Sequence, residues 1–390
     1  MTHLACAGGT CQCGEVGQPC CGGNTCSSTL VCLGPVCSCV AQVSAGGTQT
    51  CARKTDGTVW CWGANGYGQL GDGSTAARPT PGPVTNLSGA VQVSAGSYHT
   101  CAVRTGGSLW CWGNNEEGQL GDGSLVSRSA PVQTAVLSNV VEVSASRSSH
   151  ACARKADGTV WCWGRNGSGQ LGDGTTTPRP TPVQVQNLFT VVDVSAGDLH
   201  TCALKIDGTV WCWGRNPSGQ LGDGSGVDSP TPVRVVNLSN VFEISASVSH
   251  TCARKADGTI WCWGANSRGE LGDGSTTDRP TPVQVANLAG AAEVACGGVH
   301  TCARKTDGTV WCWGGNGNGQ LGDGSTTGRL LPVQVVGLFG ADHLTVGYLH
   351  GCARKTDGTL WCWGENGGGT LGDGSTIRKT TPVRALLSCP

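Results

Sequence analysis

The residues that could do chemistry in this sequence are a histidine and two cysteines that recur in the same order. In the copy at residues 300–314, His300 precedes Cys302 by two positions, and Cys312 follows after a short turn. Such a set can form a disulfide, remain as buried thiols, or bind a metal ion with the histidine as third ligand. The first copy has Gln49 in place of the histidine and keeps both cysteines. Because a metal site would not lose a ligand in this way, we favour the disulfide.

The turn between the cysteines determines whether they face one another. Asp307-Gly308 lies between two segments rich in strand formers, which is typical of a hairpin. A three-residue loop with Gly308 in the left-handed region sets Cys302 opposite Cys312, with Cα atoms about 4.5 Å apart. A two-residue loop would set Cys302 opposite Trp313 instead. With the three-residue loop, we predict seven disulfides: Cys51–Cys61, Cys101–Cys111, Cys152–Cys162, Cys202–Cys212, Cys252–Cys262, Cys302–Cys312 and Cys352–Cys362.

These hairpins belong to a repeat that covers most of the chain. A tryptophan marks it about every 50 residues, at Trp60, Trp110, Trp161, Trp211, Trp261, Trp311 and Trp361, and a constant period of this length indicates a propeller, a solenoid or an array. Each copy has four strand-like segments, such as Val91–Ala95, Thr100–Arg104, Leu109–Trp112 and Pro182–Val185. Four strands per repeat and seven repeats predict an all-β, seven-bladed β-propeller over residues 41–390.

Residues 1–40 differ from the repeats, and we expect a small segment held together by disulfides. It has little material for a core, and its nine cysteines are Cys6, Cys11, Cys13, Cys20, Cys21, Cys26, Cys32, Cys37 and Cys39. Because nine is odd, one of them needs an outside partner. We predict that Cys389 pairs with Cys39 or Cys37 and joins the last blade to the first, with an unpaired or intermolecular Cys389 as the alternative. We expect no strand to be exchanged across this join, and Cys296 to be a buried free thiol.

The amino-acid composition indicates in which compartment the protein occurs and which classes of partner it could bind. The 25 cysteines favour an oxidising compartment, so we expect an extracellular or cell-surface protein. The first ten residues contain no apolar stretch of the kind found in export signals, so we expect that the true start lies upstream or that this is a mature or trimmed form. Lys and Arg number 25 against 26 Asp and Glu, which favours neither nucleic acid nor an anionic membrane as partner. No apolar run approaches the ~20 residues of a membrane span.

A second signature follows each W-C-W triplet. "GRNGSGQLGDGTT" at residues 164–176, with "HTCA" and "DGTVW" upstream, closely resembles the regulator of chromosome condensation repeat family over residues 41–388. The resemblance implies a seven-bladed propeller. It departs from the pattern at Glu270 and Thr370, which replace glutamine.

What the resemblance implies about activity is limited. The founding activity of that family is nucleotide exchange on a small GTPase, in which a hairpin inserted in one blade takes part. The even repeat spacing here leaves no room for such an insertion, and no exchange residue can be carried over. Bacterial relatives include a secreted inhibitor that binds β-lactamases through one propeller face, and this cysteine-rich chain is nearer to that exported type.

Residues that occur in every repeat are expected to serve the fold. We therefore assign the tryptophans to core packing rather than ligand stacking and the "LGDG" aspartates to loop hydrogen bonds rather than calcium. We assign a structural role to the repeated histidines, which are His99, His150, His200, His250, His300 and His350. No non-repeated set of catalytic groups stands out, so we predict no catalysis, cofactor or metal.

Function is then expected in the loops that differ between blades. The connections between first and second strands and between third and fourth strands emerge on one face, the variable loop face. Our candidate partner-binding residues lie there: Tyr67, Tyr98, Glu116, Glu117, Arg147, Arg165, Asp198, Leu199, Arg215, Arg268, Tyr348 and Leu349. On the opposite face, Arg-Lys pairs such as Arg304-Lys305 are expected to form a solvated ring rather than an anion-binding one.

These observations predict a monomeric, extracellular, protein-binding module. The alternatives are a secreted enzyme inhibitor of the propeller type and a guanine-nucleotide exchange factor.

Overall fold

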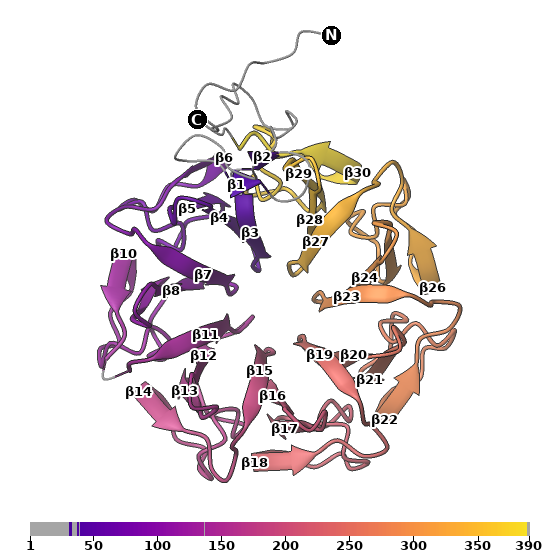
Figure 1. Cartoon of the computed structure of the whole chain (residues 1–390), viewed down its shortest axis with the longest axis horizontal. Helices are drawn as coiled ribbons and strands as arrows, with labels where there is room; N and C mark the ends of the chain where they lie inside the picture. The colour runs from indigo at the N-terminus through magenta and orange to yellow at the C-terminus, as the bar shows by residue number, and fades with distance from the viewer. Residues whose placement is uncertain (1–30, 33–36, 39, 136, 388–390) are drawn as a thin grey trace, which may run out of the picture.

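The chain forms a ring of seven four-stranded antiparallel sheets around a central axis (Figure 1). The computed structural model describes residues 31–32, 37–38, 40–135 and 137–387. In each sheet the strands follow one another in sequence order from the axis outward. The predicted seven-bladed, all-β propeller is therefore confirmed. We number the blades 1 to 7 along the chain.

The strands take equivalent places in every blade. The innermost strands are β3 (Val40–Ala45), β7 (Ala90–Ala95), β11 (Val140–Ala145), β15 (Val191–Ala196), β19 (Val241–Ala246), β23 (Ala291–Cys296) and β27 (Ala341–Val346). The second strands are β4 (Gln49–Lys54), β8 (His99–Arg104), β12 (His150–Lys155), β16 (His200–Lys205), β20 (His250–Lys255), β24 (His300–Lys305) and β28 (His350–Lys355). The third strands are β5 (Val59–Gly63), β9 (Leu109–Gly113), β13 (Val160–Gly164), β17 (Val210–Gly214), β21 (Ile260–Gly264), β25 (Val310–Gly314) and β29 (Leu360–Gly364). The outer strands are β6 (Arg78–Pro83), β10 (Arg128–Gln133), β14 (Arg179–Gln184), β18 (Ser229–Arg234), β22 (Arg279–Gln284), β26 (Arg329–Gln334) and β30 (Lys379–Arg384).

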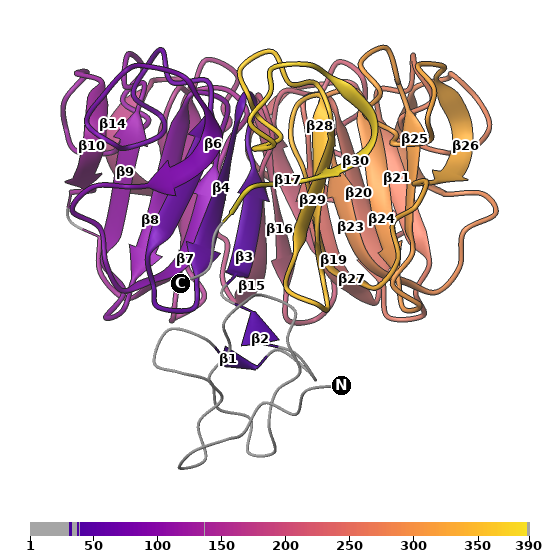
Figure 2. The same cartoon turned by 90° about the horizontal axis from the view of Figure 1, so that it is seen from above.

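A further pair of short strands, β1 (Val31–Cys32) and β2 (Cys37–Ser38), lies outside the ring, on the side of the Asp-Gly turns (Figure 2).

The sequence of each strand suits its place in the blade. The third strands read W-C-W and are buried on both faces, because neighbouring blades cover both sides of a propeller sheet. The outer strands contain prolines, as at Pro180 and Pro182, which an edge strand tolerates because it has no further strand to donate to. A register shift between Cys162 and Gly164 starts β14 three residues earlier than the sequence predicts.

The hairpin turn has the predicted three-residue loop. Gly308 has a φ of 78°, and Lys305 N donates to Thr309 O at 2.9 Å. Cys302 therefore faces Cys312, and Ala303 faces Trp311. All seven predicted blade disulfides are present, with Cα–Cα distances of 4.0–4.1 Å.

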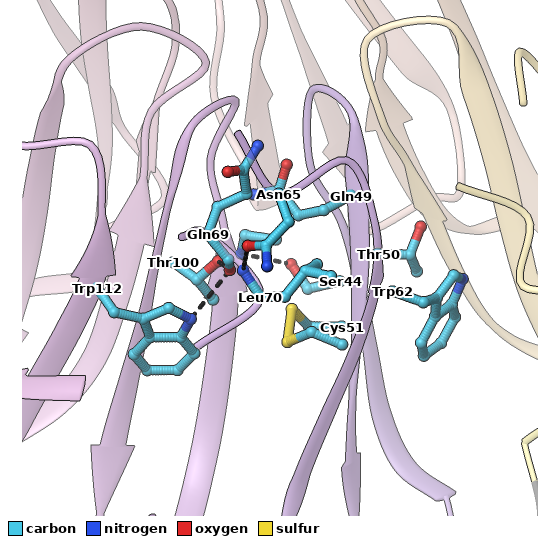
Figure 3. The surroundings of a disulfide bond; sticks show 12 residues. Ser44, Gln49, Thr50, Cys51, Trp62, Asn65, Gln69, Leu70, Thr100 and Trp112 are labelled. Atoms are coloured by element: carbon cyan, nitrogen blue, oxygen red, sulfur yellow. Dashed lines mark hydrogen bonds between the residues drawn. A yellow bond between two sulfur atoms is a disulfide. The ribbon is translucent and has the colours of Figure 1, made fainter. Parts of the chain in front are cut away.

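Each disulfide packs against a tryptophan of the next blade. The bond between Cys51 and Cys61 shares a hydrophobic cluster with Leu70 and with Trp112 of blade 2. Trp112 Nε1 donates to the carbonyl of Gln69 in blade 1 at 2.9 Å (Figure 3). Because the cysteines lie on one face of a blade and the tryptophans on the other, the same contact repeats around the ring and forms its core.

The ring closes by side-chain bonds and packing, without exchange of a strand among the described residues. Ala45 N donates to Thr345 Oγ1 at 3.1 Å, and Arg354 Nη1 donates to Ala41 O at 2.8 Å. Cys296 is a buried free thiol, as predicted. Cys389 and Cys39 lie outside the described residues, so a disulfide between the chain ends stays a prediction.

Removing one blade disulfide should destabilise the ring measurably. The double variant C202A/C212A opens a loop with a sequence separation of 10, and chain-entropy arguments give a loss of about 2.5–3 kcal/mol in unfolding free energy. The control is C296A, because alanine occupies the equivalent place in most blades. Chemical denaturation measures both. An unfolding free energy of C202A/C212A equal to that of C296A would contradict a stabilising role for the disulfide.

Candidate functional site

The variable loop face carries an exposed pair of aromatic rings. Tyr67 lies in the loop between β5 and β6, and Tyr98 in the loop between β7 and β8. Their ring centroids are 5.2 Å apart with an interplanar angle of 59°, and the residues are 42% and 44% exposed. The structure thus brings together two predicted partner-binding residues from neighbouring blades.

A third exposed tyrosine on this face belongs to blade 7, where its ring lies beside Gly298 of blade 6. Tyr348 lies between β27 and β28 and is 39% exposed. Its backbone is fixed on both sides, because its N–H donates to Gly46 O at 3.1 Å and its carbonyl accepts from Gly298 N at 2.9 Å. The neighbouring Leu349 is half-buried. We call Tyr67, Tyr98 and Tyr348 the tyrosine arc, which covers blades 7, 1 and 2.

Three exposed arginines lie on the other half of the same face. Arg165, Arg215 and Arg268 follow β13, β17 and β21, and we call them the arginine arc of blades 3 to 5. The carboxyl group of Asp198 interacts electrostatically with two of these arginines, Arg165 and Arg215. Burial raises the pKa of its carboxyl, while a hydrogen bond from Ser148 and the nearby guanidinium groups, including those of Arg165 and Arg215, oppose this shift.

The remaining candidates on this face are peripheral to the two arcs. Glu116 is exposed and Glu117 half-buried in the loop after β9. Glu117 N donates to Gln119 Oε1 at 3.0 Å, which fixes the loop. Leu199 is half-buried, and its carbonyl accepts from Arg215 N at 2.9 Å.

Arg147 does not lie with the other arginines. It comes from the loop between β11 and β12 and reaches across the central channel to blades 6 and 7. Its Nη2 donates to Cys296 O at 2.5 Å and to Val346 O at 2.9 Å. Burial lowers its pKa to about 10, so the guanidinium remains charged at neutral pH. The sequence placed it among surface anchors and gave no sign of this position.

Side-chain hydroxyls line the channel and join the blades. The fifth residue of an inner strand accepts a hydrogen bond from a backbone N–H of the next blade, as Ser144 Oγ does from Ala196 N at 3.0 Å. This hydroxyl layer consists of Ser44, Ser94, Ser144, Ser195, Ser245 and Thr345. Blade 6 has Ala295 instead, so the N–H of Val346 has no hydroxyl at this place to which it can donate.

A second polar layer lies two residues earlier on the same strands. Its members are Gln42, Gln92, Glu142, Asp193, Glu243, Glu293 and His343. Several of them also accept from the next blade, as Gln92 Oε1 does from Val143 N at 2.7 Å. We call it the carboxyl layer.

Burial controls the charge of the carboxyl layer. It raises the pKa of Glu243 to about 7, against the opposing effect of Arg254, whose Nε lies 2.9 Å from Oε2. Asp193 has no such arginine because Leu204 occupies the place. Burial, and then the neighbouring Glu142, raise its pKa well above the usual value. The layer is therefore partly protonated or paired rather than a free anionic surface.

Four of the repeated histidines, His150, His200, His250 and His350, connect one blade to the next. His200 Nε2 lies 2.9 Å from Thr251 Oγ1, and Thr251 Oγ1 donates to Gln220 O at 3.1 Å. Nε2 of His99 and His300 has no partner among the described atoms, because Ala151 and Gly351 replace the threonine. The structural role predicted for the histidines agrees with these bonds. The threonine partner was missed, although its position beside the histidine repeats.

The "LGDG" aspartates form loop hydrogen bonds, as expected. Asp72 Oδ1 accepts from Ser74 N at 2.9 Å and from Asn65 Nδ2 at 3.3 Å. Asn65 Oδ1 in turn accepts from Leu70 N at 2.9 Å.

The opposite face differs from the expected solvated ring. Arg154, Arg254 and Arg304 are half-buried and pair with carboxylates of the carboxyl layer at 2.7–3.0 Å. The lysines lie near the turn aspartates and a tryptophan: Lys305 Nζ is 3.5 Å from Asp307 Oδ2 and 5.9 Å from the Trp311 ring. The prediction was wrong for the arginines, because each lies directly across from a carboxylate of the inner strand, as Arg304 does from Glu293, and pairs with it on the face of the sheet.

One group among the described residues has the ligand types of a metal site. His250, Cys252 and Cys296 place their ligand atoms within 4.8 Å of one another. Cys252 is bonded to Cys262 and has no thiolate to offer. Burial raises the pKa of Cys296 to about 12, so its thiol is also neutral.

Comparison with models of known protein families assigns the chain to a family. Residues 149–389, more than half of it, match the RCC1-like domain. The chain belongs to this family. Residues 56–103 and 106–153 also match the regulator of chromosome condensation (RCC1) repeat, as do residues 40–69 and 90–119.

Solved structures share the RCC1-type fold at low sequence identity. Yeast RCC1 (Prp20), in a structure with Kap60 bound, has a TM-score of 0.77 and 20% identity over 85% of this chain and 84% of that one. Human WBSCR16 has a TM-score of 0.76 and 22% identity over 85% and 94%. The CRINKLY WD40 ectodomain of the Arabidopsis thaliana receptor kinase ACR4 has a TM-score of 0.51 and 20% identity over 83% and 95%.

Among the residues that the structure describes, no helix is long and apolar enough to cross a membrane.

Restoring a missing threonine should stabilise this RCC1-like ring. The variant A151T gives His99 the partner that His200 has in Thr251, and we expect a gain of about 1 kcal/mol in unfolding free energy. Chemical denaturation measures it. The matched control is A153T, at a buried position where the other blades also have alanine, and there we expect a loss. An equal loss in both variants would contradict the proposed bond.

Replacing one histidine should flatten the acid dependence of stability. Burial lowers the pKa of His200 to about 4, whereas the unfolded chain takes up that proton near pH 6.5. The folded state therefore loses stability as pH falls from about 6.5 to 4. H200Q copies the natural Gln49 and should reduce this slope by up to about 1.4 kcal/mol per pH unit.

The measurement is the unfolding free energy of H200Q and wild type at several pH values. Raised carboxyl pKa values, such as that of Glu243, act in the opposite direction in both proteins and cancel from the difference. Identical slopes would mean that His200 is not neutral in the folded state.

Proposed function

We propose that the chain is a non-catalytic protein-binding module of an extracellular, oxidising compartment and binds its partner through the variable loop face. The observation that carries this proposal is the contact between Tyr67 and Tyr98, which leaves two adjacent rings exposed on neighbouring blades. Tyrosines are favoured interface anchors because they bury a large area at a small entropic cost and keep a polar end.

The distribution of residue types suggests what such a partner presents. The tyrosine arc covers blades 7, 1 and 2, and the arginine arc covers blades 3 to 5. A complementary surface has an apolar area opposite the tyrosines and acidic groups opposite the arginines. The fixed backbone of Tyr348 supports binding without a large rearrangement of this loop.

The compartment and the absence of catalysis are part of the proposal. Seven blade disulfides favour oxidising surroundings, and a receptor-kinase ectodomain is among the structural relatives. Yeast RCC1 is a relative with a protein bound. Groups with strongly shifted pKa values, such as His200 and Glu243, are engaged by neighbouring residues rather than gathered in one cleft.

The experiment compares one residue pair with a matched aromatic on the opposite face. The wild type, Y67A/Y98A and F242A are used to capture partners from the extracellular fluid of the source cells, and the captured protein is then titrated against each. Phe242 is 70% exposed near the Asp-Gly turns. We expect Y67A/Y98A to weaken binding by roughly 2 kcal/mol or more, about thirtyfold, and F242A to leave it unchanged. Loss of binding in F242A alone would assign the interface to the opposite face.

A further inference from the structure

The central channel holds a cavity that combines one cation with many hydrogen-bond donors. The cavity has a volume of about 170 Å³ and is lined by the hydroxyl layer, by alanines such as Ala45, and by Arg147. Its lining includes no aspartate or glutamate among the described residues. The charge of the lining is therefore that of a single guanidinium.

Arg147 has an unused donor in this place. Its Nη2 is engaged by two backbone carbonyls, whereas Nη1 is shielded from solvent and has no hydrogen-bond partner among the described atoms. A buried charged N–H without an acceptor is costly. An anionic acceptor would remove that cost.

The hydroxyl layer adds further donors. Each of its oxygens already accepts a backbone N–H, as Ser94 Oγ does from Ala145 N at 3.0 Å. A hydroxyl that accepts still has its own proton to donate. Val346 N, opposite Ala295, is a further N–H without a hydroxyl partner, and it belongs to the residue whose carbonyl binds Arg147. Hydroxyl protons and this N–H thus lie in the same cavity as the guanidinium.

Among the described residues, the neighbouring titratable groups do not supply an anionic acceptor for Arg147. Cys296 is a neutral thiol, because burial raises its pKa to about 12. The carboxyl layer lies two residues away along the strands, and its glutamates are bonded to Arg154, Arg254 and Arg304. Asp198 influences Arg147 electrostatically but is not part of the lining.

We propose that the central channel binds a small monovalent carboxylate at the guanidinium of Arg147, with hydroxyls of the channel wall as additional donors. A carboxylate matches a guanidinium in charge and geometry, and one cation favours a monovalent ligand over a phosphate dianion. This site is independent of the variable loop face and of the protein binding proposed there. The carboxylate comes either from a free small acid or from the chain end of a peptide.

The first experiment uses the wild-type protein and acetate. Saturation-transfer NMR follows the acetate methyl signal at fixed pH and ionic strength, with acetamide as the neutral control of the same shape. We expect transfer to acetate and none to acetamide. No transfer to acetate would overturn the proposal without any need for a variant.

The second experiment locates the site. R147M should weaken acetate binding roughly ten- to a hundredfold, as expected for loss of a charged hydrogen-bond donor, and R384M, at an exposed arginine that ends β30, should not. Preserved disulfides and circular dichroism check the fold of R147M. Equal acetate binding by R147M and wild type would also overturn the proposal.

The third experiment distinguishes the two sources of the carboxylate. N-acetyl-glycyl-glycine with a free carboxylate, and its C-terminal amide, compete against acetate. Competition by the acid and not by the amide assigns the site to a peptide end, and absence of competition assigns it to a free small acid. Equal competition by acid and amide would overturn recognition of the carboxylate.

Discussion

Each inner strand of this propeller is a sheet edge, and its outward N–H groups must find acceptors. In the part of the chain that the structure describes, no further strand lies on the axis side, so the neighbouring blade supplies side-chain oxygens instead. Ser144 and Gln92 illustrate the two positions from which such oxygens come. This requirement explains why the fifth residue of the inner strand is a serine or threonine in six blades, and why the third is a polar side chain in all seven. The same bonds hold the blades in register and make the channel polar.

Much of the fold could be predicted because its determinants are local. The Asp-Gly turn sets the register of Cys302 and Cys312, so the conformation of one repeated turn predicts all seven blade disulfides. The number of repeats predicts the number of blades. The start of β14 was misplaced because a register shift is invisible in the alternation of residue types.

The parts that could not be predicted depend on contacts between blades. The bond between His200 and Thr251 joins residues that are far apart in sequence, and the place of Arg147 depends on the width of the channel and on carbonyls three and four blades away. The loop that contains Arg147 is one residue longer than its counterparts, but loop length does not show where the side chain points. The tyrosine arc was proposed one residue at a time, and only the structure brings Tyr67 and Tyr98 into contact.

The blades are self-contained, because each sheet is made from one continuous segment and each disulfide closes within its own hairpin. Among the described residues, no junction between blades depends on an exchanged strand. The chain could be cut at any link between an outer strand and the next inner strand and rejoined elsewhere, and every blade disulfide would survive. The same property lets whole blades be gained or lost by recombination between near-identical repeats without orphaning a cysteine.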